Sequence, residues 1–105
     1  MISTHILDTT KGAPASGVTV KLEKLNENTW AELGTDQTNI DGRIIFNCPH
    51  DAGTYRLTFM IENYYQHEEH FFMNTPIIFQ VKNTNRKYHV PLLLNPYGYS
   101  TYRGS

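Results

Sequence analysis

The sequence of 105 residues contains a single cysteine, Cys48, so a disulfide bond within it is impossible. Small domains of oxidising compartments often carry such bonds, and their absence favours a reducing compartment. A basic segment followed by a long apolar stretch, as in a signal peptide, is also missing. We therefore expect a cytoplasmic protein, or a periplasmic one if a leader has been removed. Cys48 itself is expected to be a small buried side chain.

Long apolar runs and clusters of like charge are missing as well. The longest apolar stretches span about four residues, far short of the roughly 20 that cross a membrane. Nine Lys and Arg residues are scattered against ten Asp and Glu residues, which gives a formal net charge of −1. Without a basic cluster, we expect no binding to nucleic acid and none to an anionic membrane surface.

The composition that remains is that of a folded domain. Aromatic residues make up 12% of the chain and charged residues 18%, which is too aromatic and too weakly charged for disorder. The length predicts one domain over residues 1–105, with a modest core.

Apolar and polar residues alternate in a way that predicts strands along most of the chain. Val18–Leu25 alternates over its whole length, as a half-buried strand does. Residues 12–17 are expected to be a loop, and Asn39–Gly42 a turn whose Asp-Gly pair tolerates the positive φ of a hairpin. The predicted strands cover residues 2–7, 18–25, 30–36, 43–46, 55–60, 76–81, 88–94 and 97–102.

A single segment, Glu62–Glu69, predicts a helix, since it contains no Gly, Pro or β-branched residue. Short strands separated by turns are typical of an all-β sandwich or barrel. In the last strand, Gly98 and Ser100 leave room for the close approach of a second sheet, a ligand or a partner subunit.

Three of the five histidines are expected to be unremarkable. His67 and His70 are spaced three apart on the predicted helix, a spacing that can bind zinc, but two ligands alone are a weak signal. We expect both on an exposed polar face, with no metal bound. His50 follows Pro49 in a turn and is expected to be solvated.

His5 and His89 differ, because each lies in the middle of an apolar strand. Either one alone is best explained as a hydrogen-bonded structural residue. The pair could form a site if the first and penultimate strands meet in space. Arg43, directly after the Asp41-Gly42 turn, is either a solvent-facing turn residue or a donor that could bind a carbonyl, carboxylate or enolate oxygen.

Four blocks, in order along the chain, resemble the transthyretin-related family. They are residues 3–8 (STHILD), 17–22 (GVTVKL), 38–43 (TNIDGR) and 88–105 (YHVPLLLNPYGYSTYRGS). The Tyr-Arg-Gly-Ser ending is similar to that of the 5-hydroxyisourate hydrolases and is absent from the hormone-carrying transthyretins. The residues at 71–76 and at Ile40 depart from the family pattern.

The resemblance implies a transthyretin-like β-sandwich of two four-stranded sheets with one short helix. It also implies a homotetramer with active sites where the dimers face each other. The implied reaction opens a ring amide C–N bond of 5-hydroxyisourate, giving 2-oxo-4-hydroxy-4-carboxy-5-ureidoimidazoline, and needs no cofactor.

The resemblance also implies residue roles. The catalytic set would be His5, Arg43, His89 and Ser105, and Tyr102 would hold the substrate together with His5 and Arg43. Which histidine is the general base stays open. Ser105 would orient His89 or the water, and a terminal carboxylate there would add negative charge.

Two other functions are open to such a sandwich. It could carry a small aromatic ligand in a channel, as transthyretins do, although an apolar channel gains nothing from buried ionisable groups. It could also act only as a scaffold for assembly, in which case His89→Ala would leave function intact.

Overall fold

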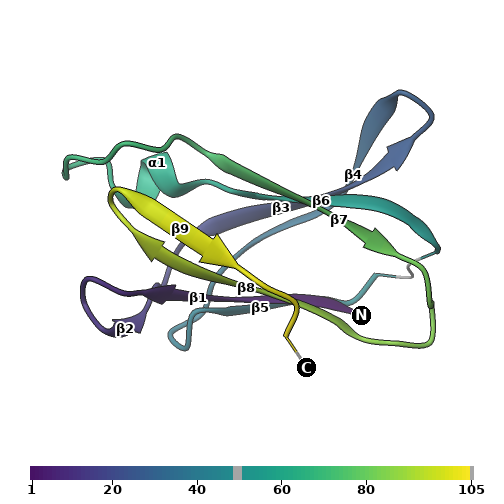
Figure 1. Ribbon diagram of the computed structural model, residues 1–105, viewed down its shortest axis with the longest axis horizontal. Coiled ribbons are helices and arrows are strands. Elements are labelled where there is room, and N and C mark those ends of the chain that lie inside the picture. Colours follow the sequence, from purple (N-terminus) through teal and green to yellow (C-terminus); the bar gives the residue numbers. More distant parts are fainter. Residues whose placement is uncertain (49–50, 105) are drawn as a thin grey trace.

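The computed structural model describes residues 1–48 and 51–104, and these fold into two stacked β-sheets with one short helix at an end (Figure 1). The first sheet contains β1 (Ile2–Asp8), β2 (Ala13–Pro14), β5 (Arg43–Phe46), β8 (Tyr88–Asn95) and β9 (Gly98–Thr101). Their order across the sheet is β2-β1-β8-β9, and β5 also pairs with β1. The second sheet contains β3 (Thr19–Asn26), β4 (Thr29–Gln37), β6 (Gly53–Phe59) and β7 (Thr75–Val81), in the order β4-β3-β6-β7. The predicted all-β sandwich with one short helix is confirmed.

The two-residue strand β2 lies in the segment that the sequence assigned to a loop. Its residues pair with Leu7 and Asp8 of β1, and proline is tolerated there because an edge position does not need its N–H. β2 and β5 occupy successive parts of the same edge of β1, whose other edge pairs with β8. The first sheet is therefore four strands wide although it contains five strands.

The core lies between the sheets and follows from the alternation in the strands. Every second residue of β1 is buried, so Ile6 faces the core while its neighbour His5 does not. Each fully buried aliphatic side chain contributes about 1.5–3 kcal/mol. The largest fully buried side chains are Tyr55, Tyr65, Phe59, Ile2, Ile6, Leu22 and Leu57. Cys48 packs against this core and is half-buried.

The Asp41-Gly42 turn is present, but it connects the two sheets rather than the strands of a hairpin. β4 before it pairs with β3, and β5 after it pairs with β1. Gly42 has a φ of +73°, and a Cβ there would lie 2.6 Å from the carbonyl oxygen of Ile6. Gly42 also accepts a hydrogen bond from the N–H of Ile6 at 2.8 Å. Only glycine combines this φ with so close an approach to β1.

The helix is shorter than predicted, because α1 covers only Ile61–Tyr64. Tyr65 directly after it is buried in the core, whereas the residues at 66–69 are exposed and offer no apolar side chain to extend a buried helical face. Short helices depend on such packing to persist. The start of α1 is instead held by Asn74, because Glu62 N–H donates to Asn74 Oδ1 and Asn74 N–H donates to Glu62 Oε2. No helix within the described residues is long and apolar enough to cross a membrane.

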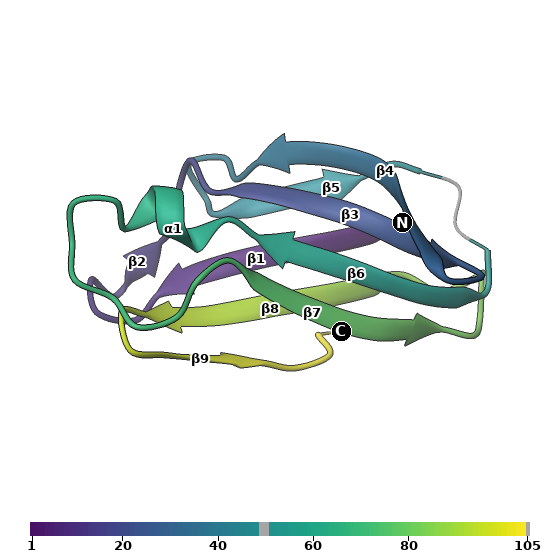
Figure 2. The same cartoon turned by 90° about the horizontal axis from the view of Figure 1, so that it is seen from above.

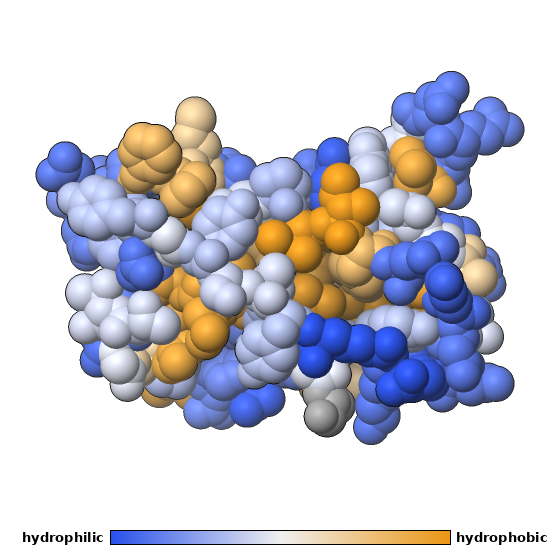
Figure 3. All heavy atoms as spheres, in the orientation of Figure 1, coloured by the Kyte–Doolittle hydropathy of each residue, from blue (hydrophilic) through white to orange (hydrophobic). Residues whose placement is uncertain are grey.

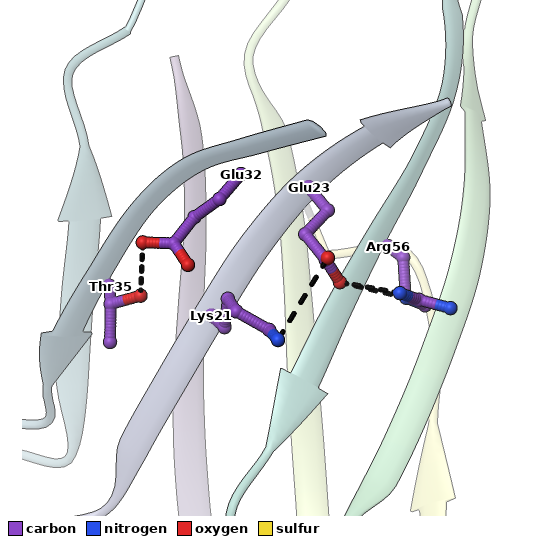
Figure 4. A network of polar contacts seen from close by, with 5 residues as sticks. All are labelled: Lys21, Glu23, Glu32, Thr35 and Arg56. Carbon is purple, nitrogen blue, oxygen red and sulfur yellow. Dashed lines mark hydrogen bonds and ion pairs between the residues drawn. The ribbon is translucent and has the colours of Figure 1, made fainter. Parts of the chain in front are cut away.

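The outer face of the second sheet carries a polar network centred on Glu23 (Figure 4). Its carboxylate is nearly buried and accepts hydrogen bonds from Nε and Nη2 of Arg56 at 2.9 and 2.7 Å. Lys21 adds an ion pair at 3.9 Å, and the guanidinium of Arg56 lies 4.2 Å from the ring of Trp30. The charge of Glu23 is thus paired across the β3–β6 ladder.

Candidate active site

The strands β5, β1 and β8 lie side by side in the first sheet (Figure 2). They carry Arg43, His5 and His89. His5 on β1 is the register partner of Arg43 on antiparallel β5. On the other side of β1, parallel β8 places His89 opposite Ser3. Directly paired residues point to the same side of a sheet, so these four side chains share the face turned away from the core. The first and penultimate strands therefore meet, which the sequence left open.

Arg43 is positioned by the turn before β5. The side-chain oxygen of Asn39 accepts hydrogen bonds from the N–H groups of Asp41 and Arg43 at 2.9 and 3.0 Å. Within the described residues, no carboxylate forms an ion pair with Arg43, and its side chain is exposed. Its guanidinium is thus free to bind an anionic or developing oxyanion oxygen.

His89 is half-buried and is contacted through one ring nitrogen. Its Nδ1 lies 2.8 Å from Ser3 Oγ. Burial lowers the pKa of His89 from its ordinary value, and the charges of Arg43 and His5 lower it further. The imidazole is therefore neutral near pH 7, which is the form that accepts a proton.

An open pocket of about 250 Å³ lies beside these residues. Its lining comprises Met1, Ser3, Thr4, Arg43, Ile44, Ile45, Lys87 and His89. This lining holds two fixed cations, Arg43 and Lys87, and no carboxylate among the described residues, so it favours an anionic ligand. His5 is not part of the lining.

Sequence reasoning missed Ser3 and Lys87. Ser3 was detectable in principle, because it lies two residues before His5 on a strand and so shares its face. Lys87 lies just outside the predicted strand, where the sequence carries no signal of its neighbours.

The C-terminal segment, residues 102–104, runs along the other side of His89. Gly104 N–H donates to the carbonyl oxygen of His89 at 2.8 Å. A Cβ on Gly104 would lie 2.5 Å from Cδ2 of the imidazole, so the bare backbone packs against the ring edge. Ser105, which follows, lies outside the described residues, and its catalytic role stays a prediction.

Tyr102 lines a second pocket, of about 230 Å³, between β7 and the C-terminal segment. The pocket is mostly apolar, with Ile77 and Phe79 on one side, and apolar surface is visible across the middle of this face (Figure 3). His89 lines both pockets and connects them. Tyr102 is thus next to His89 but not in the pocket that contains Arg43, and its contact with substrate stays a prediction.

The remaining histidines do not form a metal site among the described residues. His67 is exposed as predicted, but it lies beyond the end of α1. His70 is half-buried, with its ring stacked on Tyr65 at 5.6 Å and its Nδ1 2.8 Å from the carbonyl oxygen of Phe72. His50 lies outside the described residues.

Known proteins resemble this chain in both sequence and fold. The 5-hydroxyisourate hydrolase of Salmonella typhimurium is 46% identical over 110 residues, covering all of this chain and 81% of that protein. The structure of Klebsiella pneumoniae 5-hydroxyisourate hydrolase is 39% identical, with a TM-score of 0.86, and the match covers 99% of this chain and 98% of that one.

The fold by itself does not separate hydrolase from carrier. Transthyretin from Sparus aurata has a TM-score of 0.90, covers 98% of this chain and 95% of its own, and is only 28% identical. A model of the HIUase/Transthyretin family matches residues 2–104. The chain therefore belongs to the HIUase/Transthyretin family.

Proposed function

We propose that this protein is an enzyme that hydrolyses 5-hydroxyisourate, opening a ring amide C–N bond to give 2-oxo-4-hydroxy-4-carboxy-5-ureidoimidazoline. The observation that carries the proposal is the convergence of His5, Arg43 and His89 on one sheet face, beside a cationic pocket. The full-length similarity to hydrolases at up to 46% identity supports the same reaction.

In the first step, a neutral imidazole takes a proton from water while the water oxygen bonds to the ring carbonyl carbon. His89 fits the role of base, because burial and its cationic neighbours lower its pKa. The carbonyl oxygen becomes negative as this bond forms. The exposed guanidinium of Arg43 stabilises that charge, and a donor aimed at such an oxyanion is worth about 3–4 kcal/mol in well-studied enzymes.

In the second step, the C–N bond breaks and its electron pair stays on the ring nitrogen. That nitrogen takes a proton from an imidazolium, either His89 after the first step or His5 on the adjacent strand. The C=O bond re-forms as the C–N bond breaks, and the resulting carboxylic acid loses its proton to water, giving a carboxylate that Arg43 and Lys87 can bind.

The carrier function is disfavoured by the same residues. A pocket for an apolar aromatic ligand would have to strip water from Arg43 and Lys87 without supplying a partner, which costs free energy. Sequence identity also drops from 39% for the Klebsiella pneumoniae hydrolase to 28% for the transthyretin, although the TM-scores of the two structures are similar, at 0.86 and 0.90.

The active assembly is proposed to be a homotetramer with its sites between facing dimers. The pocket at Arg43 is open to one side of the sheet, and a second copy over this face would exclude water from the reaction. Large apolar side chains on the same molecule are exposed, among them Ile45, Ile78 and Tyr97 at 55%, 59% and 61%. Light scattering on the purified protein tests the assembly, and a monomer would contradict it.

The activity is tested by following 5-hydroxyisourate made in situ from urate by urate oxidase. Because the compound also decays spontaneously, His89→Ala is measured beside the wild type. We expect the wild type to accelerate decay and the variant to lose at least roughly a hundredfold of that rate. Circular dichroism shows whether the variant is folded. A folded wild-type protein without any acceleration would overturn the proposal.

A further inference from the structure

The hydroxyl of Ser3 is the partner of His89 Nδ1, at 2.8 Å. The two residues lie opposite each other in the β1–β8 ladder and line the same pocket as Arg43. Thr4, the next residue, points to the core and donates to the carbonyl oxygen of Val90 at 2.7 Å. Two neighbouring hydroxyls thus serve different purposes, since one holds the main chain and the other contacts the imidazole.

The direction of the hydrogen bond between Ser3 Oγ and His89 Nδ1 decides which ring nitrogen of His89 can accept a proton. A neutral imidazole carries its proton on either Nδ1 or Nε2, and the partner of one nitrogen sets the state of the other. Among the described residues none makes a hydrogen bond to Nε2 of His89. If Nδ1–H donates to Ser3 Oγ, Nε2 keeps its lone pair and can accept a proton from water.

The ring is also fixed from its other side. Gly104 donates its N–H to the carbonyl oxygen of His89 and packs its backbone against Cδ2. The imidazole is therefore held between the Ser3 hydroxyl and the C-terminal segment. A ring held in this way can keep one orientation and one tautomer.

The charges around His89 also favour its neutral imidazole. His5 on β1, Arg43 on β5, Lys87 before β8 and Arg103 in the C-terminal segment are all cationic or able to become so, and the lining of both pockets contains no carboxylate among the described residues. They disfavour an imidazolium at this position, in line with its lowered pKa.

We propose that Ser3 is a positioning residue whose Oγ accepts a hydrogen bond from Nδ1–H of His89 and so presents an unprotonated Nε2 to the pocket beside Arg43. The inference rests on the proposed hydrolysis, for which it assigns His89 as general base. Ser3 itself does not need to touch the substrate.

The test compares Ser3→Ala with Ser3→Thr, which keeps the hydroxyl, and with Thr75→Val, which removes a buried hydroxyl of the second sheet that lines neither pocket. We expect Ser3→Ala to lower kcat by roughly ten- to a hundredfold with little change in KM, less than the ~10⁴-fold loss when a serine protease loses its histidine-orienting carboxylate. Ser3→Thr should restore most of the rate. Thr75→Val should lower thermal stability and leave kcat near the wild-type value.

A second readout does not depend on activity. Nitrogen-15 NMR at a pH above the pKa of His89 shows which ring nitrogen carries the proton. We expect Nδ1–H in the wild type and in Thr75→Val, and a shift towards Nε2–H in Ser3→Ala. An Nε2–H tautomer in the wild type, or an unchanged kcat in Ser3→Ala, would overturn the proposal. If the wild type shows no hydrolysis, the proposed function fails, while the NMR result still decides the role of Ser3.

Discussion

Three causes lower the pKa of His89 from 6.5, and burial is the largest of them. The charge of Arg43 is the second cause and that of His5 the third. Arg43→Gln removes the second influence but not the first. We therefore expect the pKa of His89, followed by NMR titration, to rise in this variant and to remain below 6.5. A pKa unchanged from the wild type would show that Arg43 does not act on His89 through its charge.

The sign of this shift also has consequences for the whole pH profile. Because the neutral imidazole is the base, kcat/KM should hold as the pH falls through 6.5 and drop only near the lowered pKa. The unfolded chain binds a proton to this residue at higher pH than the folded one does. The contribution of His89 to the free energy of unfolding is therefore full above pH 6.5 and declines as the pH falls from there towards the lowered pKa.

Gly104 offers a test of the contact between the C-terminal segment and the imidazole. In Gly104→Ala the new Cβ would lie 2.5 Å from His89 Cδ2 and 3.3 Å from Pro91 Cγ, so the segment or the ring must move. We expect kcat/KM to fall at least roughly tenfold. Gly98→Ala is the control, because its Cβ meets only Asn95 atoms at 3.8 Å. Equal activity in both variants would show that this contact is dispensable.

At this scale the sequence predicts residue types better than residue partners. His5 and His89 stand out because a histidine is unusual in an apolar strand. Ser3 does not, since a serine at an outward strand position is ordinary until the register of β1 against β8 is known. That register joins residues 86 apart in the chain, and no local pattern encodes it.

Among the elements, the β3–β6 pair carries the clearest stability test, through Glu23 and Arg56 (Figure 4). Arg56→Met leaves a nearly buried carboxylate without its main partner and should lower the free energy of unfolding by roughly 2–3 kcal/mol. Adding Glu23→Met should recover most of that loss, because an apolar pair avoids the desolvation of both charges. Urea denaturation at one protein concentration measures both. A double variant no more stable than Arg56→Met would contradict this account.

Strands in which apolar and polar residues alternate are predicted well from the sequence. Features that depend on packing against distant parts of the chain are not. The eight predicted strands correspond to β1 and to β3 through β9, and all of them lie within two residues of the expected bounds. The predicted helix extends too far along the chain, because nothing local reveals that Tyr65 turns into the core. The Asp41-Gly42 turn is found, but its hairpin is not, since the choice of sheet for β5 depends on the packing of Gly42 against Ile6 of β1.

For the molecule as a whole, both ends of the chain contribute to one sheet. β1 lies at the start of the sequence and β8 near its end, and they pair in parallel along their full length. Their pairing closes a loop that spans most of the chain, and the entropic cost of closing a loop grows with its length. Contacts between residues so distant in sequence slow folding.

The parallel pairing of β1 with β8 therefore bears on the order in which this protein is made. During synthesis the strand with Ser3 and His5 leaves the ribosome before its partner strand, because His89 is added 86 residues after Ser3. A nascent chain lacking β8 has Arg43 and His5 but lacks His89, and we expect it to be inactive whatever else has folded. In refolding experiments, hydrolytic activity should return with the slowest structural phase, and its return ahead of that phase would contradict this order.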